Sequence, residues 1–114
     1  MSIDRTKMRW NGWGWTAQTD PLAGRDQVWP WLADEFEMPA LLATPPRDLD
    51  GIVLPAPRLN AAARAALTAV LGAERVRQDD YERAFHALGR SYHDLLRLRA
   101  GDFAPPDAVL YPRN

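Results

Sequence analysis

The sequence predicts a small, mainly α-helical module of three or four short helices, with an irregular N-terminal half and a short C-terminal strand. Its 114 residues are enough for one domain with a single core. Apolar residues recur most clearly at helical spacing in residues 60–104, and none of the ten prolines lies in that stretch. All five tryptophans lie in the first third of the chain. The chain therefore divides into two unlike halves.

Residues 1–59 are expected to be an irregular segment, rich in tryptophan and proline, with one short helix. The six-residue run that begins at Trp10 places glycines between indoles, which favours turns over a helix. A helix is predicted over residues 30–38, because its first residue is a proline and Pro39 ends the apolar pattern. Residues 52–54 give at most a short extended segment.

Residues 60–104 are expected to form three helices in succession. Asn60 is a good N-cap for a helix over residues 61–71, where alanine, leucine and valine recur at positions i, i+3, i+4, i+7 and i+8. Gly72 then supplies the C-terminal stop. This is the clearest helix in the sequence.

Two shorter helices follow, each opened by a residue that can cap it. Asp79, with a glutamate three residues later, is similar to a capping box and opens a helix that ends at Gly89. Ser91, with an aspartate three residues later, opens the third helix, which has arginines in its last turn and ends at Gly101. Three helices with agreeing caps and apolar stripes form a consistent local prediction.

The last residues, 105–114, begin with two prolines and contain a short apolar run. Residues 108–111 are predicted to form a strand, with no segment left in the chain to pair it. A strand without a partner is unusual in a finished domain, because its backbone groups stay unpaired. We therefore expect the chain to be truncated before the domain that completes this sheet.

Composition excludes several classes of function. The formal net charge is -1, so no overall field attracts nucleic acid or an anionic membrane. The absence of cysteine excludes disulfides, thiol nucleophiles and Cys-bound metals. No apolar run approaches the length of a membrane span, and the first nine residues lack the apolar core of a signal peptide. We therefore expect a cytoplasmic protein.

The titratable residues do not assemble a complete catalytic or metal site. His86 and His93 are the only histidines, and two histidines without a third ligand fall short of a zinc set. A triad of Ser91, His93 and Asp94 fails on geometry, since such near neighbours on one helix do not converge. We predict no catalytic, cofactor-binding or metal-binding residue in this chain.

Four arginines with tyrosines among them lie in the second half, a composition that nucleic-acid-binding faces share. Acidic residues lie between them, so a solvated or ion-paired face is the preferred interpretation and no nucleic-acid partner is expected. No glycine-rich phosphate loop of the known spacings is present. The four are Arg83, Arg90, Arg97 and Arg99.

The tryptophan-rich run at Trp10 allows two interpretations. Indoles supply a large contact area with one polar group each, as surfaces for a partner or ligand do. The same residues also suit a packed corner that anchors the N-terminus. Composition leaves both open.

Three landmarks, in order, resemble a known family. They are the tryptophan–glycine opening at residues 8–14, the Gly-Arg-Ser to Arg-Ala-Gly stretch at residues 89–101, and Pro-Asp-Ala-Val-Leu-Tyr-Pro at residues 106–112. Together they resemble the N-terminal region of FAD-linked oxidases similar to alkyldihydroxyacetonephosphate synthase, of the vanillyl-alcohol-oxidase type of flavoprotein. The single residues that carry the resemblance as structural landmarks are Arg83, Gly89, Ser91, Asp94, Arg99 and Gly101.

The resemblance implies that residues 105–114 lead into a flavin-binding domain outside this chain. FAD is then the cofactor of the parent enzyme, the chain itself holds none and is inactive alone, and its partner is the remainder of the parent. An ether-lipid-like glycerone phosphate derivative is the implied product class. Whether the segment covers an apolar substrate channel or supports a homodimer is left open. The rival hypothesis is a free-standing helical module that docks a protein through its tryptophans.

Overall fold

The computed structural model describes residues 4–40 and 47–113, and this part of the chain is mainly helical, as predicted. Among these residues, no helix combines the length and apolarity needed to cross a membrane. The helices are α1 Val28–Glu35, α2 Ala61–Leu71, α3 Asp80–Phe85 and α4 Tyr92–Ala100, and the strands are β1 Val76–Arg77 and β2 Val109–Leu110. Single 3-10 turns lie at Arg5–Lys7, Leu49–Gly51 and Ala73–Arg75.

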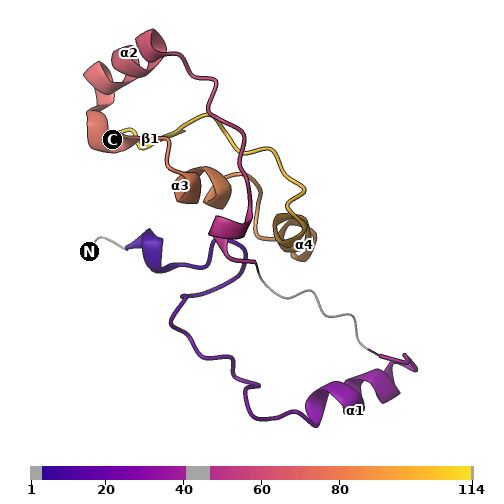
Figure 1. Cartoon of the computed structure of the whole chain (residues 1–114). Helices are drawn as coiled ribbons and strands as arrows, with labels where there is room; N and C mark the ends of the chain where they lie inside the picture. The colour runs from indigo at the N-terminus through magenta and orange to yellow at the C-terminus, as the bar shows by residue number, and fades with distance from the viewer. Residues whose placement is uncertain (1–3, 41–46, 114) are drawn as a thin grey trace.

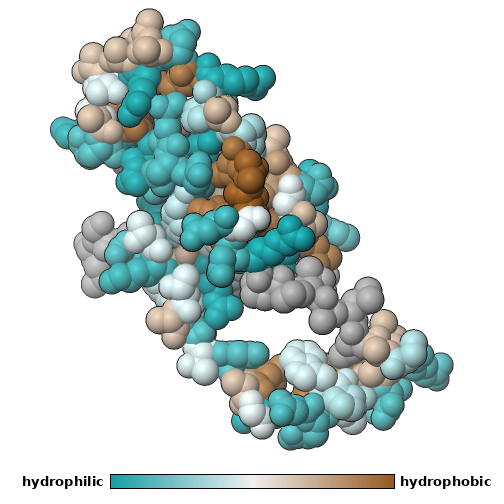
Figure 2. Space-filling model, in the orientation of Figure 1, coloured by the Kyte–Doolittle hydropathy of each residue, from teal (hydrophilic) through white to brown (hydrophobic). Residues whose placement is uncertain are grey.

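The molecule consists of a body and an arm (Figure 1). We define the arm as residues 16–40, which include α1, and the body as the other described residues. The principal extents are 58 × 32 × 23 Å and the radius of gyration is 18.3 Å, whereas a compact chain of this length has a radius near ~13 Å. In the space-filling view the arm lies clear of the body over most of its length (Figure 2).

The core lies in the body and draws on both halves of the sequence. Its buried residues are Trp10 from the N-terminal half and Ala84, Leu95 and Leu98 from α3 and α4. Ile52 has extended dihedral angles, φ -121° and ψ 124°, and residues 52–54 belong to no strand. Their side chains alternate, because the first and third pack on the core while the middle one is 97% exposed. No residue of the arm is buried.

Local sequence signals placed two helices correctly. The Asn60 side chain accepts a hydrogen bond of 2.8 Å from the backbone N–H of Ala63, and α2 has the predicted bounds. Ser91 forms the predicted capping box of α4, and Gly101 ends that helix with a φ of 76°. This left-handed conformation is one that glycine adopts without strain.

Two helices differ in their bounds from the prediction. α1 begins at Val28, two residues early, because the N–H groups of a first turn have no helical partner and a proline there costs no bond. It also ends at Glu35, three residues before the predicted end, and Glu37 has a φ of 51°, outside the right-handed helical region. α3 ends at Phe85 and not at Gly89. The helical pattern is lost at Ala87, whose N–H donates to the Ala84 carbonyl at 3.2 Å in a 3-10-type bond. The Phe85 carbonyl then accepts a hydrogen bond of 3.1 Å from Arg90 Nη2.

The prediction that the C-terminal strand has no partner in the chain is wrong. β2 pairs antiparallel with β1, with Val76 opposite Leu110 and Arg77 opposite Val109. The Tyr111 N–H also donates to the Arg75 carbonyl at 3.0 Å. The sequence did not indicate β1, because two residues between a 3-10 turn and a helix are too few to show a strand period.

Candidate functional site

The tryptophan-rich run forms a turn that is fastened to the body at its first two residues. Trp10 is buried, and its Nε1–H donates to the Arg47 carbonyl at 3.2 Å. Asn11 is buried beside it and donates to the same carbonyl at 2.9 Å. Trp13 and Trp15 remain 62% and 44% exposed. The packed-corner interpretation therefore holds for the first two residues, and the surface interpretation stays open for the other two.

Two arginines of the helical half hold this turn in place. Arg90 Nη1 donates to the Trp10 carbonyl at 2.6 Å, and its guanidinium lies 4.1 Å from the centroid of the Phe85 ring. Arg99 Nε donates to the Asn11 carbonyl at 3.4 Å. In return, Trp13 Nε1 donates to the Arg90 carbonyl at 3.0 Å. These contacts join segments about eighty residues apart in sequence.

Arg83 is the most enclosed polar side chain of the body, with 1% of the residue exposed. Its Nε donates to the Pro106 carbonyl at 2.8 Å and its Nη2 to the Pro55 carbonyl at 2.7 Å. Its Nη1 lies 3.5 Å from the Asp80 carboxylate. The sequence predicted a solvated or ion-paired arginine face. Arg83 is ion-paired but not solvated, because it supplies donors to two proline-flanked segments that lack regular backbone pairing.

A carboxylate lies buried between α3 and the C-terminal segment. Glu82 is 5% exposed, and it accepts a hydrogen bond of 2.5 Å from the Tyr111 hydroxyl. Its Oε2 lies 3.4 Å from His86 Nδ1. The guanidinium of Arg5 lies 4.8 Å from the centroid of the Tyr111 ring. The group ties the N-terminus, α3 and the segment after β2 together.

Stability is expected to fall at high pH because two tyrosines are protected from ionisation. Burial raises the pKa of Tyr111 above its ordinary 10.0, and the adjacent Glu82 carboxylate raises it further. Burial also raises the pKa of Tyr81, whose hydroxyl donates to the Met8 carbonyl at 2.7 Å. A raised folded-state pKa contributes stability below the unfolded value that is lost as pH rises through the folded value.

The measurement is a tyrosinate absorbance titration above pH 10, followed in parallel by circular dichroism. Tyr111→Phe and Tyr81→Phe should each remove one late component of the titration. A titration curve that neither substitution changes would show that these phenols are not protected.

The residues weighed as a catalytic or metal site do not form one. The Ser91 hydroxyl donates to the Asp94 carboxylate at 2.7 Å as part of the helix cap. His93 is exposed and bonds to neither of them, and His86 faces Glu82. Within residues 4–40 and 47–113, no group of three His, Asp or Glu side chains is placed to hold a metal ion.

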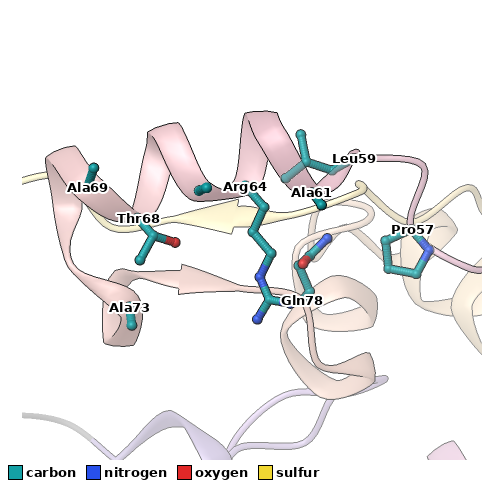
Figure 3. A pocket seen from close by; sticks show the side chains of 9 residues that line it. Pro57, Leu59, Ala61, Arg64, Thr68, Ala69, Ala73 and Gln78 are labelled. Atoms are coloured by element: carbon teal, nitrogen blue, oxygen red, sulfur yellow. The ribbon is translucent and has the colours of Figure 1, made fainter.

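A groove of about 760 Å³ lies between α2 and the residues on either side of β1, Ala73 and Gln78 (Figure 3). Small side chains of α2 form one wall, and Arg64 and Gln78 extend into it. Arg64 has no ion-pair partner among the described residues. The lining holds one cation, Arg64, and one hydroxyl, Thr68, with no carboxylate or imidazole beside them to act as a base.

The landmark residues of the sequence resemblance all have structural roles here. A side chain at Gly89 would place its Cβ 2.7 Å from the Asp94 carboxylate, so the close approach of the α4 cap requires glycine. Asp107, in the Pro-Asp lead-in to β2, accepts a hydrogen bond of 3.0 Å from the Arg58 N–H. Sequence reasoning missed Asn11, Glu82 and this role of Asp107, because their partners lie 29 to 49 residues away.

Comparison with known proteins finds relatives of two sizes. No family model matches the chain. Alkyldihydroxyacetonephosphate synthase of Trypanosoma brucei brucei is 45% identical over 49 residues, which are 42% of this chain and 8% of that protein. Protein Rv2250A of Mycobacterium tuberculosis is 36% identical over 106 residues, which are 92% of this chain and 69% of that protein.

Two solved structures of alkyldihydroxyacetonephosphate synthase share the fold. Each superposes with a TM-score of 0.69, at 24% and 25% sequence identity. The matches cover 97% and 96% of this chain but only 24% and 23% of the solved chains. The chain thus spans about a quarter of those enzymes.

The length of the match to Rv2250A and the superposition on the synthases lead to one conclusion. The chain belongs to the same family as Rv2250A, and it resembles the N-terminal region of alkyldihydroxyacetonephosphate synthase, an FAD-linked oxidase.

Proposed function

We propose that this chain is the N-terminal helical segment of an FAD-dependent, alkylglycerone-phosphate-synthase-like enzyme and that it is inactive alone. The observation that carries the proposal is the superposition of 97% of the chain on about a quarter of a solved synthase. In this proposal residues 1–59 form the irregular segment, residues 60–104 the three-helix region, and residues 105–114 lead into the flavin-binding domain. That domain is the partner of the chain.

The residues of the body support this role by fixing the C-terminal segment. Arg83 bonds the Pro106 carbonyl, Tyr111 bonds Glu82, and β1 pairs with one edge of β2. The other edge of β2 has no strand beside it among the described residues. A free edge is a template for a further strand. The C-terminal segment is therefore fixed in its direction by the body, and the free edge of β2 is available to a strand of the next domain.

The chain's own residues do not fit FAD. A pyrophosphate is bound by successive N–H groups of a glycine-rich turn or by a helix N-terminus with such a loop. The four glycines with positive φ here are Gly14, Gly24, Gly72 and Gly101, which lie in separate turns. We therefore assign no step of flavin chemistry to any residue of this chain and place the FAD site in the remainder of the enzyme, where the flavin supplies the redox chemistry.

Flavin binding tests the proposal directly. The 114-residue chain, refolded with excess FAD and desalted, is expected to show no visible flavin absorbance. The product of the reading frame continued past Asn114 should retain about one FAD per chain. A yellow 114-residue chain with stoichiometric flavin, or a continued product that binds none, contradicts the proposal.

A second candidate is a free-standing helical interaction module that docks another protein through its tryptophans. Rv2250A favours it, because the 106 matched residues make up 69% of that protein, which is therefore itself far shorter than the synthases. A stop codon directly after Asn114, together with stable binding of the chain to a separate protein, would support this candidate over the first.

A further inference from the structure

The arm exposes four large apolar side chains that nothing in the described chain covers. On and after α1, the exposed fractions are 48% for Trp29, 58% for Trp31, 65% for Phe36 and 39% for Met38. A further cavity of about 320 Å³ opens beside Trp29, between α1 and the returning Pro39. None of the four residues belongs to the core cluster. The arm thus adds little to the stability of the body.

The exposed area is too large for a self-contained protein of this size. The chain exposes 8632 Å², whereas a folded monomer of its mass exposes about 6,300 Å². The excess of roughly 2,300 Å² on one partner is what a large, permanent interface buries. Indoles are the side chains that most often anchor such interfaces.

Charge restricts what the arm can bind. It carries five acidic residues and one base, Arg25, which gives a net charge of -4. The whole chain has a net charge of -1, so the remainder carries +3. An acidic arm is repelled by anionic lipid, and α1 has only eight residues. The partner it fits is a protein surface with apolar pockets surrounded by lysine or arginine.

We propose that the arm docks on the flavin-binding part of the enzyme through Trp29 and Trp31; this rests on the proposed function. The superposition on the synthases covers 97% of the chain, so the arm has a counterpart there, within chains about four times as long. The additional three quarters of those chains are the partner that a protruding arm of this kind can reach. The cavity beside Trp29 receives an apolar side chain of that partner.

The experiment measures binding between the 114-residue chain and the flavin-binding chain encoded downstream of it, produced separately with its FAD. Trp29→Ala/Trp31→Ala should weaken binding at least ~100-fold, since two central indoles are lost. The control Tyr92→Ala removes a 67% exposed aromatic from the body and should change binding less than ~3-fold. Trp29→Phe/Trp31→Phe should restore most of the affinity. Alanine favours helix, and circular dichroism verifies that each variant remains folded.

Each outcome decides the matter. If the double alanine variant binds the flavin-binding chain as tightly as the wild type does, the arm is not the docking element, and the proposed function is unaffected. A downstream product without flavin, or one that the wild-type chain does not bind, removes the proposed function and this partner with it. Two further results would also overturn the proposal, if they depend on Trp29 and Trp31 and occur without the flavin chain. Self-association would assign the arm to a second copy, and binding to phosphatidylcholine vesicles would assign it to lipid.

Discussion

Replacing Arg83 by methionine is expected to lower the free energy of unfolding by about 3–5 kcal/mol. The guanidinium donates to the Pro55 and Pro106 carbonyls, at 2.7 and 2.8 Å, in a site from which water is nearly excluded. Methionine fills much of the same space but leaves both carbonyls without a donor. Domains of this size are stable by about 5–15 kcal/mol, so the loss is a large fraction of the total. Urea denaturation followed by circular dichroism measures it.

Arg97→Met is the matched control. Arg97 lies on α4 with its side chain 51% exposed, and its Nε lies 3.3 Å from the Asp102 carboxylate. An exposed pair of this kind contributes at most about 1 kcal/mol, so the control should unfold at nearly the wild-type urea concentration. Equal effects of the two substitutions would mean that Arg83 does not hold the proline-flanked segments together.

Trp10→Ala is expected to destabilise the body by about 3–5 kcal/mol. The indole is 8% exposed, its centroid lies 6.1 Å from that of the Phe103 ring, and its Nε1–H bonds the Arg47 carbonyl. Its removal leaves a large cavity among Ala84, Leu95 and Leu98 and takes away the apolar contact between the N-terminal half and the helices. Thermal unfolding followed by near-ultraviolet circular dichroism measures the loss.

Trp31→Ala provides the comparison for the same residue type. Trp31 is 58% exposed on the arm, so its substitution should change the stability of the body by no more than about 0.5 kcal/mol. Similar losses for Trp10 and Trp31 would contradict the division into a packed body and a separate arm. Trp10→Phe should fall between the two, because it keeps a ring in the core but removes one of the two donors to the Arg47 carbonyl, the other being Asn11.

These two residues relate stability to the proposed function. Trp10 and Arg83 are the points at which the irregular first half and the lead-in to β2 are fixed to α3 and α4. If the chain supports a flavin-binding domain, its use depends on the direction in which it holds residues 105–113. Substitution of Trp10 or Arg83 should therefore reduce flavin retention in the continued enzyme, although in this proposal neither residue contacts the flavin.

The sequence by itself determined the helical class, the bounds of α2 and α4, and the caps at Asn60 and Ser91. Those features depend on contacts within about four residues, which a local pattern records. Its family resemblance was confirmed by the synthase matches. The capping roles of Ser91, Asp94 and Gly101 also follow from the sequence, whereas the roles of Arg83 and Arg99 depend on distant carbonyls.

Only the tertiary structure decided which polar residues turn inward and which apolar ones stay outside. Arg83 is buried because the carbonyls of Pro55 and Pro106, more than twenty residues away along the chain, need donors. β2 has a partner because the fold brings β1 beside it from more than thirty residues away. The tryptophans divide between one buried residue, Trp10, and four exposed ones for the same reason. Burial depends on what packs against a residue, and a local pattern carries no record of distant contacts.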